Sequence, residues 1–167
     1  AGVSSNSTNY AYDSTNENWH GPVTAIKQLP TTSQWKTTLT NAKRQIITET
    51  GTTSTTGGTL PTAFSYEGYA ARLLAAQEVN VGCGFTVGTA KIGELSTKCK
   101  YLIENTKYSN ASNKTYGEWL EIPRTANSDT VWRVNGNYCS VDYDYASTAA
   151  YNGVRPTIEV AKTNIDY

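Results

Sequence analysis

The spacing of apolar residues changes along the chain, and this change constrains the fold more than any other feature of the sequence. Between Ser33 and Gly51, apolar side chains recur every three or four residues, which predicts a helix with Ser33 as N-cap and Gly51 as stop signal. A second helix is expected over Tyr69–Val79. Further on, the spacing falls to two residues, which predicts strands at 118–122, 131–134 and 157–160.

A chain of 167 residues is long enough for one hydrophobic core and too short for two enzymatic domains. Helices followed by strands favour an α+β fold, with two helices packed on a small, twisted, mainly antiparallel sheet. Residues 1–32 are rich in Ser, Thr and Asn and are expected to form a polar segment packed on the domain, which spans residues 33–167.

Few side chains can carry acid–base, thiol or metal chemistry. His20 is the only histidine, and the Gly21-Pro22 pair after it predicts a turn rather than a catalytic base. Fourteen basic residues balance fourteen acidic ones, so no broad positive field exists to hold nucleic acid. The sequence therefore predicts no enzyme activity, no cofactor, no metal site and no nucleic-acid partner.

The cysteines bear on the compartment. Cys83 and Cys99 bracket a short loop, and a disulfide between them would stabilise the fold by roughly 3 kcal/mol. Two reduced, half-buried thiols are the alternative, and Cys139 is left over in either case. No run of 18 apolar residues occurs, so no membrane insertion is expected in this segment. We expect an extracellular or cell-surface location, with any anchor or targeting segment outside this chain.

The strongest functional signal is the tract from Asn135 to Asn152, which has four Tyr among eighteen residues and no Lys, Arg, Glu or Gln. Tyr offers a large, rigid contact area, while Ser, Gly and Asn add adaptable hydrogen bonds. The tract therefore predicts a ligand-binding surface, and a polar hairpin with stacked aromatics is the alternative. Asp142 and Asp144 would share a strand face and could reach a hard cation, but solvated acidic residues are the favoured interpretation. The candidate ligand-binding residues are Asn135, Asn137, Tyr138, Ser140, Asp142, Tyr143, Asp144, Tyr145, Tyr151 and Asn152.

Four short motifs carry a family resemblance over roughly residues 30–165. They are Gly153–Val160 (GVRPTIEV), Glu118–Pro123 (EWLEIP), Val131–Val134 (VWRV) and Ala71–Glu78 (ARLLAAQE). With them the chain resembles a bacterial family of surface or pilin-associated domains that have the C-type-lectin-like fold and are similar to the variable proteins of diversity-generating retroelements. The resemblance implies that the Trp-containing strands and the G-V-R-P strand form the sheet core, with the tract on an exposed ligand-binding face.

Retroelement-diversified proteins vary at adenine-derived codons, which disfavour Lys, Glu, Gln, Met and Trp. None of these five types occurs from Val134 to Val154, although they supply 26 of the 167 residues. The resemblance thus implies a diversified tract, whereas the same composition also suits an ordinary hairpin. The sugar-binding motifs of calcium-dependent lectins, Glu-Pro-Asn and Trp-Asn-Asp, do not occur, so calcium-assisted sugar binding is not expected.

A second set of residues is expected to be structural. Arg155 is flanked by apolar residues, and we expect its guanidinium to pair with a carboxylate or backbone carbonyls and to fix the end of the tract to the core. Trp119 and Trp132 are expected to be core anchors, alongside Cys83 and Cys99.

These patterns predict non-catalytic surface recognition, as in an adhesin or a receptor, of a protein or glycan ligand on another surface. The alternative is a structural, pilin-like or filament subunit whose aromatic tract packs against neighbouring copies, in which case the chain would self-associate.

Overall fold

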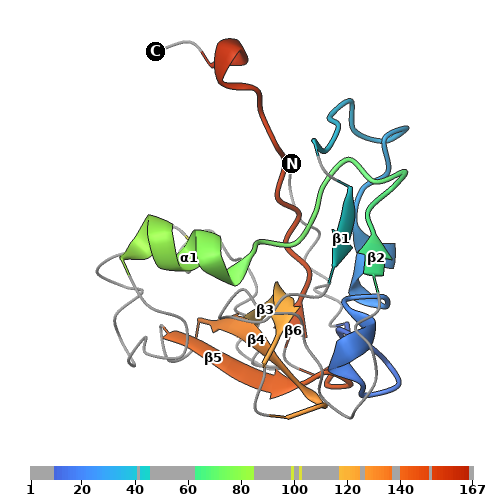
Figure 1. The fold of residues 1–167 in the computed structure, drawn as a ribbon, viewed down its shortest axis with the longest axis vertical. Coiled ribbons are helices and arrows are strands. Elements are labelled where there is room, and N and C mark those ends of the chain that lie inside the picture. The colour runs from blue at the N-terminus through green and yellow to red at the C-terminus, as the bar shows by residue number, and fades with distance from the viewer. Residues whose placement is uncertain are drawn as a thin grey trace.

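A four-stranded sheet built by the second half of the chain forms the centre of the fold (Figure 1). The computed structural model describes residues 10–40, 42–45, 63–84, 99, 102, 117–124, 127–136, 140–150 and 152–165. The sheet contains β3 (Gly117–Pro123), β4 (Thr130–Asn135), β5 (Ser140–Tyr145) and β6 (Asn152–Gly153), in the order β5-β4-β3-β6. Strand β4 is antiparallel to both β3 and β5, whereas β6 runs parallel to β3.

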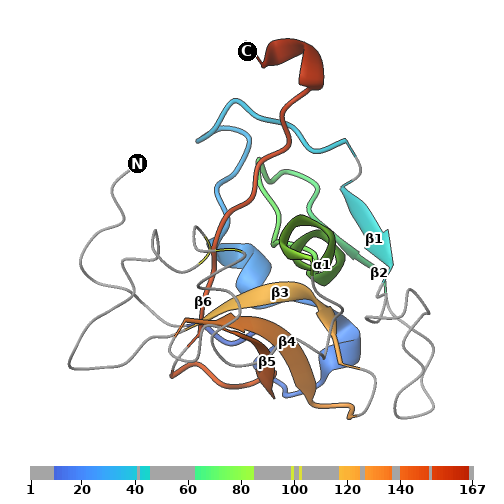
Figure 2. The ribbon, with the colours of Figure 1, turned by 90° about the vertical axis from the view of Figure 1, so that its left-hand side faces the viewer.

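Alternation along β4 and β5 gives the sheet two different faces. Trp132 pairs with Tyr143 across the ladder, and the adjacent Arg133 pairs with Asp142. Because successive side chains of a strand point to opposite faces, the aromatic pair and the charged pair lie on opposite sides. The register of β3 against β4 also shifts within the strand, and the sheet is curled (Figure 2).

Each face of the sheet covers its own hydrophobic core. On one face, helix α1 (Ala76–Cys83) packs on the sheet and forms a helix-side core that includes Val79, Leu120 and Trp132 (Figure 2). On the other face, the N-terminal segment with the 3₁₀ helices η1 (Asn18–His20) and η2 (Ala25–Gln28) forms an N-terminal core around Tyr12 and Trp119. The described part of the N-terminal segment is thus integral to the fold.

Two further elements flank the sheet. Strands β1 (Lys43–Gln45) and β2 (Ala63–Ser65) pair antiparallel, and Phe64 of β2 joins the N-terminal core. After β6 the chain passes α1 and leads away from the body to the 3₁₀ helix η4 (Lys162–Asn164) (Figures 1 and 2). Within the described ranges, none of the helices has the length and apolar character needed to cross a membrane.

The predicted arrangement of two helices packed on a sheet is wrong. The C-type-lectin-like architecture predicted together with it is therefore wrong as well. Residues 33–40 form turns and extended chain, and a strand begins at Lys43, so no helix occupies the described part of the first predicted helix. This stretch is rich in Thr, whose branched side chain disfavours helix and competes for backbone hydrogen bonds. The hydroxyl of Thr37, for example, donates to the carbonyl oxygen of Ala70 at 2.8 Å.

The second predicted helix starts later than expected, at Ala76 rather than Tyr69. Residues 69–75 are extended and form isolated bridges, from Arg72 to Thr157 and from Leu74 to Leu120 among them. A fully buried extended run has the same apolar density as a buried helix, so periodicity does not separate the two.

Two of the three predicted strands are present. Those at 118–122 and 131–134 are confirmed as β3 and β4. The strand predicted at 157–160 is wrong, because within this stretch only Thr157 forms a β-bridge. The strand that pairs with the outer edge of β3 is β6 instead.

A disulfide joins the end of α1 to Cys99. The Cα atoms of Cys83 and Cys99 are 5.3 Å apart, and the two residues are separated by 16 positions in the sequence. Both cysteines lie in the helix-side core, so the bridge ties α1 to that core. The disulfide expected from the spacing is therefore present, in place of the alternative of two reduced thiols.

Candidate functional site

The acidic residues of the predicted tract converge on Arg133 of the neighbouring strand. Arg133 donates from Nε to Oδ1 of Asp142 at 2.7 Å and from Nη1 to Oδ2 of Asp144, also at 2.7 Å. Asp142 and Asp144 share one face of β5, as their spacing predicts, and Arg133 lies on the same face of β4. The positive charge that the two carboxylates share is therefore the guanidinium of Arg133.

Two asparagines of the predicted set extend this arginine network. Asn152 accepts from Arg133 Nη1 at 3.0 Å and donates to Asp144 Oδ2 at 3.0 Å, while Asn135 donates to Asp142 Oδ2 at 2.7 Å. Asn152 is fully buried against Gly117, where an added Cβ would stand 2.7 Å from the Asn152 Oδ1. The network therefore links β4, β5 and β6, and its side chains hold each other.

The tyrosines of β5 lie on the other face of the strand. Tyr143 is 48% exposed and Tyr145 is 56% exposed, although both belong to a strand of the main sheet. The ring of Tyr143 meets Trp132 edge to face at 6.1 Å, and the Arg124 guanidinium lies 3.8 Å from the centre of the Tyr143 ring. We call Arg124, Tyr143 and Tyr145 the tyrosine face, and the side with Arg133, Asp142 and Asp144 the arginine face.

The remaining predicted residues divide into two groups. Ser140 is 4% exposed, so its side chain is covered by the fold. Asn137, Tyr138 and Tyr151 lie outside the described residues, as does Cys139. Of the ten predicted residues, the structure therefore exposes Tyr143 and Tyr145 and engages or buries the others that it describes.

Arg155 pairs with a carboxylate, as its sequence context predicts. Its Nε lies 2.5 Å from Oε2 of Glu118, a residue of β3 that is 1% exposed. Burial raises the pKa of Glu118 to about 7, although Arg155 opposes this shift. The pair connects the chain that follows β6 to the centre of the sheet, so the role expected for Arg155 agrees with its position.

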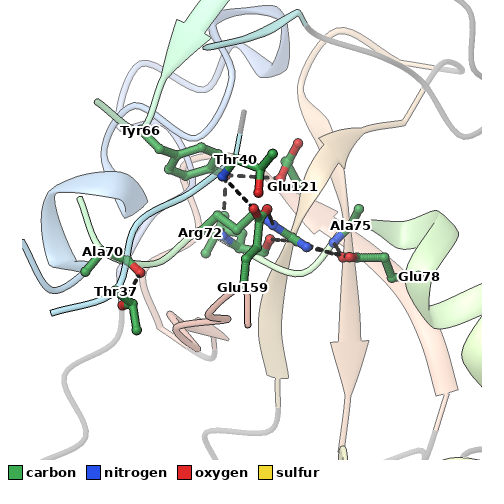
Figure 3. A network of polar contacts seen from close by, with 10 residues as sticks. Thr37, Thr40, Tyr66, Ala70, Arg72, Ala75, Glu78, Glu121 and Glu159 are labelled. Carbon is green, nitrogen blue, oxygen red and sulfur yellow. Dashed lines mark hydrogen bonds and ion pairs between the residues drawn. The ribbon is translucent and has the colours of Figure 1, made fainter. Parts of the chain in front are cut away.

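Arg72, which the sequence analysis did not single out, connects three segments of the chain and forms a clamp (Figure 3). Arg72 pairs with Glu78 of α1 and donates from Nε to Oε1 of Glu159 in the C-terminal segment at 2.8 Å. The backbone N–H of Thr40 donates to the other oxygen of Glu159 at 2.7 Å. Burial opposes ionisation of Glu159, but the hydrogen bonds from Thr40 and Arg72 prevail and lower its pKa. Thr40 and Glu159 also line a surface hollow of about 320 Å³. Because Arg72 engages the carboxylates of both Glu78 and Glu159, we interpret the clamp as structural.

His20 does not form a catalytic triad. Its Nδ1 lies 2.6 Å from Oδ2 of the buried Asp13, and its Nε2 lies 3.3 Å from Oε2 of Glu17. A triad needs a nucleophile at the second ring nitrogen, where this histidine has a carboxylate instead. The turn predicted for His20 is present, since η1 ends there and Gly21 follows with φ +78°.

Neither a metal site in the described residues nor a known protein family helps to assign a function to these side chains. No group of three or more His, Cys, Asp or Glu side chains in the described part of the chain is arranged to hold a metal ion. Comparisons with protein-family models, curated proteins and solved structures find no match for this chain. The resemblance to bacterial surface domains therefore stays a prediction from short motifs.

Proposed function

We propose that the protein is a non-catalytic recognition protein that binds a partner protein at a bacterial cell surface through the tyrosine face of β5. The observation that carries this proposal is the exposure of Tyr143 and Tyr145 on a strand whose opposite face is fixed by Arg133. A rigid support means that little conformational freedom is lost when the rings are covered.

The chemistry of the tyrosine face suits a protein partner. Tyr and Arg are enriched in the centres of protein interfaces, because each combines a large contact area with hydrogen-bonding groups. Arg124 lies against the Tyr143 ring, so the three side chains present aromatic area with a positive charge beside it. The disulfide between Cys83 and Cys99 suits the oxidising conditions outside the cell.

Cell-surface binding of a double variant tests this proposal. Fluorescently labelled Tyr143→Ser/Tyr145→Ser protein should need at least about tenfold more protein for half-saturation of bacterial and host cell preparations than the unchanged chain. Ile158→Ser/Val160→Ser is the matched control, since it removes two apolar side chains that are 43% and 51% exposed in the C-terminal segment. Equal binding by the unchanged chain and the tyrosine variant would contradict the proposal.

A filament or pilin-like subunit is the second candidate, and the position of β5 favours it. In the described sheet, β5 is an edge strand with β4 as its one neighbour. An edge strand can pair with the same strand of a second copy, which would also cover the tyrosines. Sedimentation over a wide concentration range distinguishes the candidates: assembly that is lost in Tyr143→Ser/Tyr145→Ser favours the subunit, and a monomer throughout excludes it.

The proposal includes diversification by a retroelement, but only at exposed positions of the tract. Asn135, Ser140 and Asn152 are buried, so free variation there would leave unsatisfied or badly packed side chains. Sequencing of the region encoding residues 127–155 across one population should therefore show variation at Tyr143 and Tyr145 with the buried positions unchanged. An invariant tract would exclude diversification and leave a fixed recognition surface.

A further inference from the structure

Two neighbouring hollows lie on the surface formed by the turn after η2 and the segment after β2. The larger has a volume of about 590 Å³ and is lined by Gln34 and Trp35 among others. The smaller, of about 490 Å³, is lined by His20 and Asp13 among others. Lys27 and Tyr69 line both hollows, so the two adjoin, and we call the larger one the groove. Each volume falls within the range of roughly 300–1,000 Å³ that is usual for small-molecule sites.

The wall that carries Gln34 and Trp35 is held in place by the chain itself. The backbone N–H of Trp35 donates to the Thr31 carbonyl at 2.9 Å, and Oε1 of Gln34 accepts from the Thr31 N–H at 2.9 Å. Thr31 forms a bridge with Tyr69, and Ala70 N–H donates to the Pro30 carbonyl at 2.8 Å. The groove is thus preformed, which lowers the entropic cost of binding.

Several hydrogen-bond donors that line the larger hollow have no partner among the described residues. Within the described residues, no hydrogen bond uses the Lys27 ammonium, the Tyr69 hydroxyl, the Trp35 indole N–H or the amide N–H of Gln34. Lys27 is the one charged side chain among the residues that line this hollow. Donors and a positive charge together favour a ligand that is rich in oxygen acceptors and carries an acidic group.

The aromatic rings narrow the ligand class further. Trp35 is 38% exposed, and Tyr69 is held against the N-terminal core, so both present part of a ring to the groove. A sugar ring has an apolar C–H face that stacks on an aromatic ring and hydroxyls that accept hydrogen bonds at its rim. Proline-rich peptides also dock on aromatic grooves, but the polar side chains of Lys27, Gln28 and Gln34 suit them less well.

We propose that this groove binds an acidic oligosaccharide, with a sugar ring stacked on Trp35 and its carboxylate paired with Lys27. Gln34 and Tyr69 donate to the ring hydroxyls. The site is separate from the tyrosine face, because none of the residues that line either hollow belongs to β5. The two proposals can therefore fail independently.

Isothermal titration with defined probes tests the groove. The probes are a glucuronate-containing tetrasaccharide of hyaluronan, tetragalacturonate, neutral chitotetraose and a proline-rich decapeptide. At least one acidic tetrasaccharide should bind at least about tenfold more tightly than chitotetraose, a ratio that corresponds to about 1.4 kcal/mol. No binding of either acidic probe, or binding of the peptide alone, would overturn the proposal.

Three variants locate the binding on the protein. Trp35→Ala should abolish measurable binding, and Lys27→Gln should reduce affinity for the acidic probe to that for chitotetraose. Lys36→Gln is the matched control, since Lys36 is a nearby exposed lysine that lines a different hollow. An acidic probe that binds Trp35→Ala or Lys27→Gln as tightly as the unchanged chain would contradict the assignment. Thermal unfolding of each variant confirms that it is folded.

Discussion

On the arginine face of β5, Asp142 and Asp144 bind Arg133 through two hydrogen bonds of 2.7 Å, whereas on the tyrosine face Tyr143 and Tyr145 expose about half of their surface. The four residues alternate within one strand and come from one compositional tract. Their environments differ because Arg133 and Asn152 cover the face with the two aspartates. On the opposite face, Val141 belongs to the helix-side core, whereas Tyr143 and Tyr145 lie beyond it. Composition thus marks a tract, and strand alternation divides it into a hydrogen-bonded side and an exposed aromatic side.

Removal of Arg133 is expected to have the largest effect on this division. Arg133→Met leaves two partly buried carboxylates and Asn152 without their shared donor, so the free energy of unfolding should fall by about 4 kcal/mol. Urea denaturation measures the loss. The triple variant Arg133→Met/Asp142→Asn/Asp144→Asn is the control and should recover part of it, because the stranded negative charges are gone. A loss below about 1 kcal/mol in the single variant would show that the network contributes little.

The buried Glu118 provides a contrast with the well-satisfied aspartates. Its pKa is about 7 in the folded protein and near 4.5 for an ordinary Glu, so the folded state binds more protons between these values. The free energy of unfolding should therefore fall by about 3 kcal/mol as the pH rises from 4.5 to 7, with the stabilisation present below that window. Glu118→Gln should remove this dependence, as followed by urea denaturation at several pH values. The same slope in both proteins would contradict the assignment.

The two aspartates should differ from each other. Asp144 accepts from Arg133, Asn152, Thr148 and the backbone of Tyr145, whereas the contacts described for Asp142 come from Arg133 and Asn135. Asp144→Asn should therefore lower the free energy of unfolding by about 2 kcal/mol and Asp142→Asn by about 1 kcal/mol. The reverse order, measured in the same urea titrations, would mean that contact number does not govern the arginine face.

The smallest effect is expected on the tyrosine face. Arg124→Ala removes the guanidinium that lies 3.8 Å from the Tyr143 ring centre, and the free energy of unfolding should fall by less than about 1 kcal/mol. Thermal unfolding at low salt checks the value. A loss as large as that of Arg133→Met would show that the tyrosine face also holds the fold together.

Local rules of spacing and context predicted several features of this molecule. If residues 142–144 form a strand, as they do, alternation puts Asp142 and Asp144 on one face. Loop spacing favoured a disulfide between Cys83 and Cys99 over two reduced thiols, and the apolar flanks of Arg155 predicted a carboxylate or backbone carbonyls as its partner. Each of these depends on a short stretch of chain or on one contact.

Features that depend on which strands pair, and in which register, were not predicted. Arg133 becomes the centre of a network because β4 pairs with β5 and Asn152 follows from a third strand. Asn135 and Asn152 have the composition of a contact surface, yet their partners inside the fold decide that they are buried. The first predicted helix, which does not occur in the described residues 33–40 and 42–45, shows a different limit, since its apolar spacing suits a helix while its Thr content favours extended chain.

The most direct measurement compares the unfolding free energies of two matched double variants of β5. Asp142→Ser/Asp144→Ser should lose about 3 kcal/mol, because Arg133 then lacks both anionic partners. Tyr143→Ser/Tyr145→Ser should lose about 1 kcal/mol or less, because its side chains are half-exposed. Equal losses, or a larger loss in the tyrosine variant, would contradict the division of β5 into a face that stabilises the fold and an exposed face that contributes little to stability.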